Sequence, residues 1–374
     1  MKKVALILCI ALIGLLTFFS FGLADNGSED TNENLKYGKV ISIQRNISEP
    51  TEEYPFKGQV VKLKITNGNY KGKVIEATNV MTGNPHYDLE VKPGQRVLIS
   101  IKDKDGEIQS ASIHDMARDI PLIILSILFL LTLVIIGGFR GLKSLISLVL
   151  TISLIFTVML PLLLKGYNPM LLTIGLSAVI TALSLVLISG WKRKTLAAIL
   201  GIIGGTTCAG LLAFIFGHAA HLTGLGSQEA QMLGYIQDYK LDFQGILFAS
   251  MLFGALGAVM DVGISIASAI EEVYLANPLV TPRDLFKAGM NVGKDIMGTM
   301  TNTLILAYTG SSLPLLLILV GYKSSFVKVI NLDLIASEII RALTGSLGLF
   351  IAIPLTAAFS TWLIYKETTK KFYG

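Results

Sequence analysis

Residues 257–269 read "GAVMDVGISIASA" and place one aspartate in a run of otherwise apolar and small residues. The surrounding apolar run, from about 244 to 268, is long enough for a helix to cross a bilayer, which takes about 20 residues. The stretch therefore predicts a membrane-spanning helix that carries the carboxylate of Asp261.

The rest of the chain has the same character. Its 374 residues are 52% hydrophobic and only 15% charged, and the mean hydropathy is +0.64. This composition excludes an ordinary soluble protein of this length. Eight apolar runs are long enough to span a bilayer, at about 4–23, 120–138, 144–164, 169–190, 196–217, 244–268, 299–320 and 341–365.

The first apolar run allows two interpretations. Lys2 and Lys3 precede it and small residues follow at Gly22 and Ala24, a pattern that fits a retained anchor and a cleaved secretory signal equally well. The cysteines, Cys9 and Cys208, both fall inside predicted spans, so no disulfide and no metal site is predicted.

The distribution of basic residues predicts the orientation. With the amino terminus inside, the cytoplasmic segments hold thirteen Lys and Arg residues and the short outer loops hold four. Both termini are therefore predicted to be cytoplasmic, in a bacterial cytoplasmic membrane, if the first helix is retained. The net charge of +5 is explained by this bias and gives no reason to expect nucleic-acid binding.

A different pattern precedes the main group of spans. After the polar linker "DNGSEDTNENL", five short segments are rich in β-branched residues, largely alternate and are separated by turn signals. They predict five antiparallel strands in a small barrel that resembles an OB-fold. The segments are 38–44, 58–66, 72–80, 95–102 and 106–114. The isolated His86 and His114 give this domain no catalytic cluster, so we expect it to hold a position or bind a partner.

The predicted fold is a membrane all-α bundle of seven spans plus an N-terminal anchor or signal helix, with a small extracytoplasmic all-β, OB-like domain. The expected domains are the anchor or signal helix at 1–24, the linker and β domain at 25–118 and the seven-helix domain at 119–374.

Polar and small residues follow one face of the predicted sixth span. They recur every three or four positions, so they lie along one side of a helix. These residues are Gly254, Gly257, Asp261, Ser265, Ser268 and Glu272. Small residues let membrane helices pack closely, and a carboxylate facing lipid costs about 3 kcal/mol or more. We therefore expect this face, with Asp261, to point into the bundle.

The seventh span begins with a second polar face. Asn291, Asp295, Gly298, Asn302 and Thr309 share it, and Thr299 adds a hydroxyl on a neighbouring face. We expect Gly254, Gly257 and Gly298 to be helix-packing positions. Together, the two faces predict a site for a substrate or an ion between the sixth and seventh spans, joined by a cytoplasmic loop from about 270 to 295.

Three longer motifs carry a resemblance to a known family. "GAVMDVGISIASAIEE", "GKDIMGTMTNTLILAYTG" and "SEIIRALTGSLGLFIAIPLTA" resemble the YibE/F family of multi-pass bacterial membrane proteins. The resemblance covers most of the chain and implies a permease-like layout, with an outer β domain ahead of the helices. It implies that Asp261, Asp295, Gly298, Asn302 and Arg341 matter, and it implies no particular substrate or reaction.

Glu338 and Arg341 lie three residues apart before the last span, as an intrahelical ion pair would. One interpretation is an amphipathic segment whose long side chains reach the headgroups. In the other, Arg341 faces the bundle and helps to bind an anion or to gate the outer side.

The sequence gives little support for an enzymatic function. Two aspartates on adjacent helices could share a proton as in aspartic proteases, but Lys294 stands where the Gly-x-Gly-Asp pattern of intramembrane proteases has its second glycine. His218 and His221 have a spacing that can bind metal, yet no third ligand is defined. No phosphate-binding loop or hydrolase elbow occurs, so no enzyme and no cofactor is predicted.

The leading functional prediction is a permease-like transport protein. Asp261 would change charge or bind a cation, Ser265, Thr299 and Asn302 would supply neutral ligands, and Asp295 would act at the inner mouth. The alternative is a non-transporting membrane scaffold whose β domain binds a partner in the envelope. Beyond the lipid bilayer, the expected partners are an unidentified solute or ion and either an envelope protein or a second copy of the chain.

Overall fold

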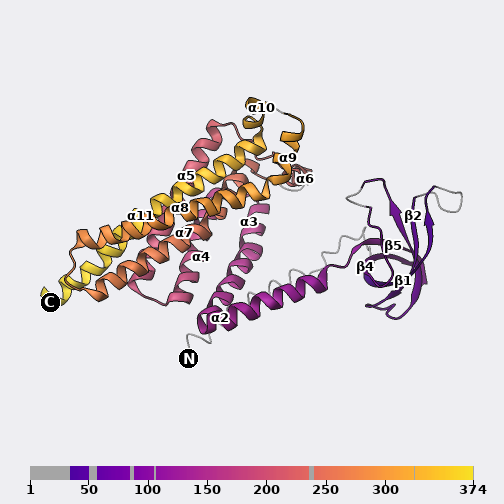
Figure 1. Ribbon diagram of the computed structural model, residues 1–374, viewed down its shortest axis with the longest axis horizontal. Coiled ribbons are helices and arrows are strands. Elements are labelled where there is room, and N and C mark those ends of the chain that lie inside the picture. Colours follow the sequence, from indigo (N-terminus) through magenta and orange to yellow (C-terminus); the bar gives the residue numbers. More distant parts are fainter. Residues whose placement is uncertain are drawn as a thin grey trace. The chain divides into compact units, whose positions relative to one another are not determined.

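A computed structural model describes residues 34–49, 57–84, 88–104, 107–235, 240–323 and 325–373 (Figure 1). The chain divides into two compact units, Ala24–Ile135 and Ile136–Gly374. The predicted anchor or signal helix at 4–23, together with Cys9 and His86, lies outside the described residues.

The first unit contains a five-stranded β domain, as the alternating segments predict. Its strands are β1 (Asn34–Ile47), β2 (Lys57–Ile65), β3 (Val74–Met81), β4 (Arg96–Lys104) and β5 (Glu107–Met116). They form a closed barrel in the order β1-β2-β3-β5-β4. The expectation that all the strands are antiparallel is wrong for one pair, because β3 and β5 run parallel at Thr78 and Ser112. A closed ring with an odd number of strands cannot alternate direction throughout.

Alternating side chains fill the barrel. Leu63, Ile65, Ile99 and Ile101 have no exposed surface and form its centre with neighbouring valines. β1 is long enough to pair with both β2 and β4, and its register shifts twice along β2, which increases twist and helps the sheet to close.

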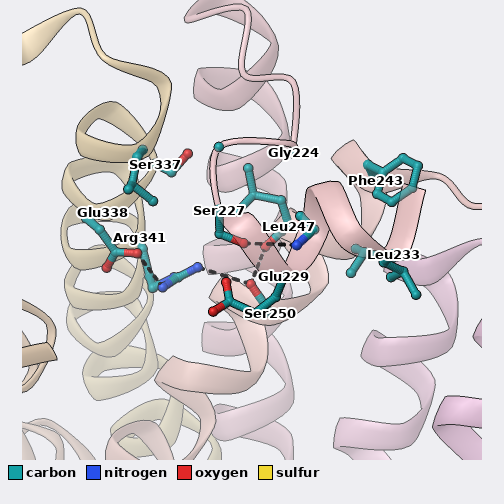
Figure 2. Close-up of a pocket in the computed structure, with 14 residues that line it drawn as sticks. Gly224, Ser227, Glu229, Leu233, Phe243, Leu247, Ser250, Ser337, Glu338 and Arg341 are labelled. Carbon is teal, nitrogen blue, oxygen red and sulfur yellow. Dashed lines mark hydrogen bonds and ion pairs between the residues drawn. The ribbon is translucent and has the colours of Figure 1, made fainter. Parts of the chain in front are cut away.

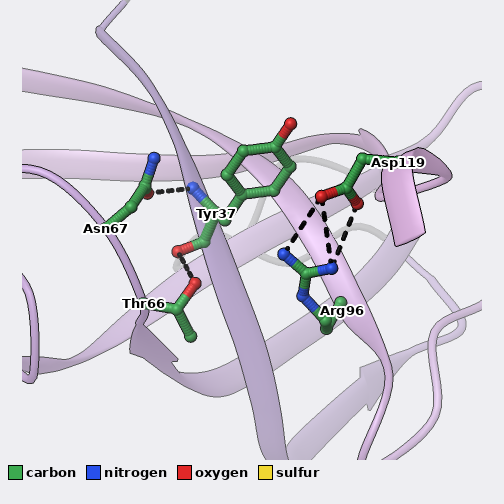
Figure 3. Close-up of polar contacts among 5 residues, drawn as sticks. All are labelled: Tyr37, Thr66, Asn67, Arg96 and Asp119. Atoms are coloured by element: carbon green, nitrogen blue, oxygen red, sulfur yellow. Dashed lines mark hydrogen bonds and ion pairs between the residues drawn. The ribbon is translucent and has the colours of Figure 1, made fainter. Parts of the chain in front are cut away.

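An ion pair connects the barrel to the helix that follows it. Both guanidinium Nη atoms of Arg96 in β4 donate to the carboxylate of Asp119 at 3.1–3.3 Å (Figure 3). The same guanidinium lies 5.2 Å from the centre of the Tyr37 ring. The Tyr37 amide in turn donates to Asn67 Oδ1 at 2.7 Å (Figure 3). Because Asp119 is the first residue of α2 (Asp119–Leu154), these contacts fix the start of that helix.

We expect the carboxyl of Asp88 to titrate below its usual range. It accepts hydrogen bonds from the Thr82 and Gly83 amides at 2.5 and 2.8 Å, and these bonds lower the pKa of Asp88. The carboxylate stabilises this turn above the unfolded pKa of about 3.9, and the stabilisation is lost as the pH falls through the lower folded pKa. Carboxyl-carbon NMR shifts measure this titration. Midpoints at or above about 3.9 contradict the bonded geometry.

The second unit is helical. In addition to the rest of α2, it contains η1 (Ile155–Met159), α3 (Leu160–Leu164), α4 (Pro169–Ser189), α5 (Arg193–Ala219), α6 (Gln228–Gly234), α7 (Phe243–Ala276), α8 (Pro282–Ser311), α9 (Leu313–Gly321), α10 (Phe326–Ile330) and α11 (Asp333–Tyr373). α5, α7, α8 and α11 pack side by side, and α4 packs against α5 and α7 (Figure 1).

Among the described residues, five helical stretches are long and apolar enough to cross a membrane, or six if α8 and α9 form one bent span. The stretch Asp119–Leu164 contains a break at Gly138, whose φ of 52° and ψ of −134° are not helical. The run at 299–320, predicted as one span, is instead divided between α8 and α9, which are bent by 61°. Pro314 in the first turn of α9 favours a new helix start there.

The loop between the predicted sixth and seventh spans is also shorter than expected. α7 continues to Ala276 and α8 begins at Pro282, so the connection comprises only residues 277–281 rather than about 270–295. Polar residues in the flanking sequence are compatible with helix, and Thr281 caps α8 by accepting a hydrogen bond from the Asp284 amide at 3.2 Å.

Small residues bring α5 and α11 into direct backbone contact. A Cβ added to Gly205 would lie 2.5 Å from the Ala352 Cβ and 2.7 Å from the Gly348 carbonyl oxygen. A Cβ added to Gly348 would lie 2.9 Å from the Gly205 carbonyl oxygen. Gly348 and Ala352 lie four residues apart on α11, which is the small-residue pattern of membrane helix pairs. This crossing holds the centre of the bundle together.

Candidate functional site

A cavity opens at the end of the bundle where α6 lies and where α7 and α11 begin, which we call the α6 end. Its volume is about 400 Å³. α6, the start of α7 and the first turns of α11 surround it (Figure 2). The polar residues that line it are Ser227, Glu229, Ser250, Ser337, Glu338 and Arg341.

The loop before α6 is fastened to both neighbouring helices. The Thr223 hydroxyl donates to the Asp333 carboxylate at 2.5 Å, at the start of α11. Gln244 Nε2, in the first turn of α7, donates to the Leu222 carbonyl oxygen at 2.6 Å. Gly224 has φ 77°, and a Cβ there would overlap the backbone of Phe243. The wall of the cavity therefore has a defined backbone position.

Arg341 and Glu338 form an ion pair at the base of the cavity. Arg341 Nη1 donates to Glu338 Oε1 at 2.6 Å, and Nη2 donates to the Ser250 hydroxyl on α7 at 3.3 Å (Figure 2). The two charged side chains are only 22% and 18% exposed. Arg341 therefore faces α7, as the second interpretation of this pair expects.

Several atoms of this group can still donate or accept a hydrogen bond. Arg341 Nε, Glu338 Oε2 and the Tyr308 hydroxyl are buried and have no hydrogen-bond partner among the described residues. The Arg341 guanidinium lies 6.0 Å from the Tyr308 ring centre. Tyr308 and Glu338 also line a second cavity of about 250 Å³ between α8, α9 and α11. The ion pair thus lies between two cavities and offers both a donor and an acceptor.

The polar residues of α7 lie elsewhere. Asp261 and Ser265 are exposed on the surface of the bundle, whereas Val259, Val262, Ile266 and Ile270 form the buried face. The expectation that Asp261 points into the bundle is therefore wrong for the single chain. The helix buries its apolar stripe against α5 and α11, and the Ser265 hydroxyl donates to the Asp261 carbonyl oxygen at 2.7 Å.

The predicted residues of α8 share this outward position. Asp295, Thr299 and Asn302 are exposed, and the Thr299 hydroxyl donates to the Ile296 carbonyl oxygen at 2.9 Å. None of them lines the two cavities at the α6 end. The structure therefore brings Arg341 into a cavity and leaves the other five predicted site residues on an outer face.

Of the three glycines predicted to be helix-packing positions, one contacts another helix and two do not. A Cβ added to Gly254 would lie 2.9 Å from the Tyr308 hydroxyl oxygen, so this glycine packs against α8. Gly257 and Gly298 would have no atom within 4 Å of an added Cβ. These two positions make no helix contact within the described chain.

A second ion pair lies near the opposite end of the bundle. Lys194 Nζ at the start of α5 lies 2.5 Å from Glu271 Oε2 near the end of α7. Both side chains line a cavity of about 160 Å³ together with Tyr274 and Ser360. His218, at the α6 end, packs against the rings of Phe214 and Phe248, with centroids 4.2 and 5.5 Å away.

Sequence reasoning missed Ser250, Glu229 and Tyr308 as parts of the α6-end site. Ser250 lies four residues before Gly254 and therefore on the same side of α7, so extending the predicted polar face by one turn would have found it. Tyr308 is one aromatic residue in an apolar run, and no spacing connects it to Arg341, 33 positions later. Only the packing of α8 against α11 brings them together.

Comparison with known families covers both units of the chain. The family described as YibE/F-like protein matches residues 125–366, and the YibE/F family N-terminal domain matches residues 34–116. Curated proteins and solved structures give no significant match. The two matched regions correspond to the apolar helices and to the β-barrel, and the chain therefore belongs to the YibE/F family.

Proposed function

We propose that this chain is a permease-like transport protein of the bacterial cytoplasmic membrane, which moves an ion or a small polar solute. In this arrangement the break at Gly138 divides the stretch Asp119–Leu164 into two spans, and α8 with α9 forms one, giving seven. The α6 end and residues 25–118 face outward. Clusters of basic residues near the opposite end, such as Lys192–Lys194, support this orientation.

The observation that carries the proposal is the half-buried Arg341–Glu338 pair with unpartnered atoms between two cavities. A buried ion pair is weak support for stability, because desolvation offsets most of the attraction. Ionisable groups within membrane bundles mark substrate or ion pathways instead. A cavity with a few convergent polar groups is the usual form of a small-molecule site.

A transport pathway also requires a second polar site further along the bundle. Asp261 is the one charged residue between Asp242 and Glu271, so it is the group best placed to change charge during a transport cycle. Ser265, Thr299 and Asn302 supply neutral oxygens near the same depth, and Asp295 lies further towards the opposite end.

Arg341→Lys tests the role of the pair at the α6 end. Lysine keeps the charge but loses the planar fork that reaches Glu338 and Ser250 together. We therefore expect the flux of protons or divalent cations into liposomes to fall about tenfold, which corresponds to about 1.4 kcal/mol. Internal pH-sensitive and metal-sensitive dyes measure it.

Arg283→Lys is the matched control, because Arg283 is an exposed residue in the first turn of α8. Its flux is expected to equal that of the wild type. Equal flux from wild type, Arg341→Lys and Glu338→Gln contradicts a role for the ion pair in transport.

A scaffold function has one observation in its favour. The β-barrel carries an open cleft of about 660 Å³ lined by Lys57, Gln59, Asp88 and Glu90, a surface that fits a polar partner in the envelope. Deletion of residues 36–115 separates the two functions. A permease retains flux after the deletion, whereas a scaffold has no flux before it and loses partner capture after it.

A further inference from the structure

The exposed polar surface of α7 and α8 is a continuous feature of the bundle. It consists of Gly257, Asp261 and Ser265 on α7 and Lys294, Gly298 and Asn302 on α8, and all six are exposed. We call it the α7–α8 polar face. Neither Asp261 nor Lys294 forms a side-chain hydrogen bond or ion pair within the described residues of the chain.

This face lies within the apolar length of the helices. Asp261 is ten residues from Glu271, about 15 Å along α7 at about 1.5 Å per residue. A carboxylate that faces lipid at such a depth carries a large free-energy cost. The face is therefore expected to be covered by protein.

Asp261 and Lys294 lie at similar depths on antiparallel helices. A Cβ added to Gly293 would lie 3.3 Å from Ile266 Cδ1, which places these two residues at one level. From that level Asp261 is five residues and Lys294 one residue towards the α6 end. The difference of about 6 Å in depth, at about 1.5 Å per residue, is within reach of the four-carbon stem of lysine.

The apolar segments that precede Arg140 in the sequence cannot neutralise the Asp261 carboxylate. Residues 4–23 and 120–139 contain no charged side chain. A second copy inserted in the same orientation brings Lys294 to the depth of Asp261. In a two-fold arrangement each copy supplies one of these charges to the other, so two equivalent pairs form.

The glycines favour the same occupant. Gly257 and Gly298 have no atom within 4 Å of an added Cβ, so they leave room at the centre of the face. Small residues at such positions allow helices of neighbouring chains to approach closely. We propose that a second copy of this chain docks on the α7–α8 polar face and pairs its Lys294 with Asp261 of the first copy.

Charge reversal in separate chains tests this pairing. Full-length chains with two different tags are co-expressed and co-purified in lipid nanodiscs. Asp261→Lys alone and Lys294→Asp alone each place like charges together, and we expect co-purification to fall at least tenfold. When one tagged chain carries Asp261→Lys and the other Lys294→Asp, both pairs are complementary again, and co-purification is expected to return to within twofold of the wild type.

A chain that carries both substitutions separates the alternatives. If the pair forms within one chain, only this double variant regains normal behaviour, and the mixture of single variants stays separated. That result overturns the proposal, as does wild-type protein that is monomeric in nanodiscs.

Cysteine cross-linking provides a second measurement that leaves the charges intact and does not depend on the folding of the reversed variants. In a Cys9→Ser/Cys208→Ser background, Gly298→Cys is expected to form a cross-linked dimer in membranes. Leu183→Cys is the control, because Leu183 is 45% exposed on α4, a helix that contributes no residue to this face. Equal cross-linking at both positions, or none at Gly298→Cys, overturns the proposal. The inference concerns charge burial, so a failure of the transport assay leaves it standing.

Discussion

Asp261→Asn is expected to lower transport to the leak of protein-free liposomes, a loss of at least tenfold, while membrane insertion stays normal. Asparagine keeps the size and hydrogen-bonding shape of aspartate but has no charge to gain or lose. Asp261 is the one ionisable residue between Asp242 and Glu271, so no neighbour on α7 can replace it. Flux is measured with pH-sensitive and metal-sensitive dyes.

Asp261→Glu is the matched control for this prediction. Glutamate keeps the titratable carboxylate on a side chain one methylene longer, so we expect flux within about tenfold of the wild type, about 1.4 kcal/mol. Normal flux from Asp261→Asn contradicts the assigned role. The assigned role is also contradicted if Asp261→Glu loses as much flux as Asp261→Asn although both variants are folded.

Gly205→Leu is expected to prevent the bundle from folding into a stable unit. Even a Cβ at this position would lie 2.7 Å from the Gly348 carbonyl oxygen, which is backbone and cannot rotate away. A leucine forces α5 and α11 apart, and overpacking of this kind costs about 3 kcal/mol or more. Thermal unfolding and size-exclusion chromatography of the purified protein measure the loss.

Gly175→Leu provides the comparison within the same bundle. Gly175 lies in α4, is exposed and has no atom within 4 Å of an added Cβ. The same substitution there is expected to leave the unfolding temperature nearly unchanged. Similar losses from both variants contradict the assignment of the α5–α11 crossing as the centre of the fold.

The β domain shows how far sequence patterns can lead. Alternation in segments such as 58–66 and the Asn67–Gly68 turn predict strands and their connections, because both signals are local. β2 and the strands around it lie where they are expected. The parallel pairing of β3 with β5 depends on closure of the ring, which no single segment encodes.

The orientation of α7 shows where sequence reasoning stops. Periodicity correctly places Gly257, Asp261 and Ser265 on one face, because the helix repeat is local. It does not say whether that face or the opposite one, with Val262 and Ile266, meets α5 and α11. A single chain need not hide every charge from lipid, because a second copy of the chain can cover an exposed polar face.

Arg341 and Glu338 illustrate an intermediate case. Their spacing predicts an ion pair within one helix, and the structure has it at 2.6 Å. The sequence left open whether the pair faces headgroups or the bundle. The contact with Ser250, 91 positions away, settles the direction of Arg341 and depends on the packing of α11 against α7.

Flux through purified full-length protein in liposomes is the decisive measurement of transport. Proton and divalent-cation gradients are imposed in turn across liposomes with wild-type protein, with Asp261→Asn and without protein. We expect flux from the wild type well above the protein-free leak, and we expect Asp261→Asn to remove it. Leak-level flux from folded wild-type protein under every imposed gradient contradicts it and favours the scaffold.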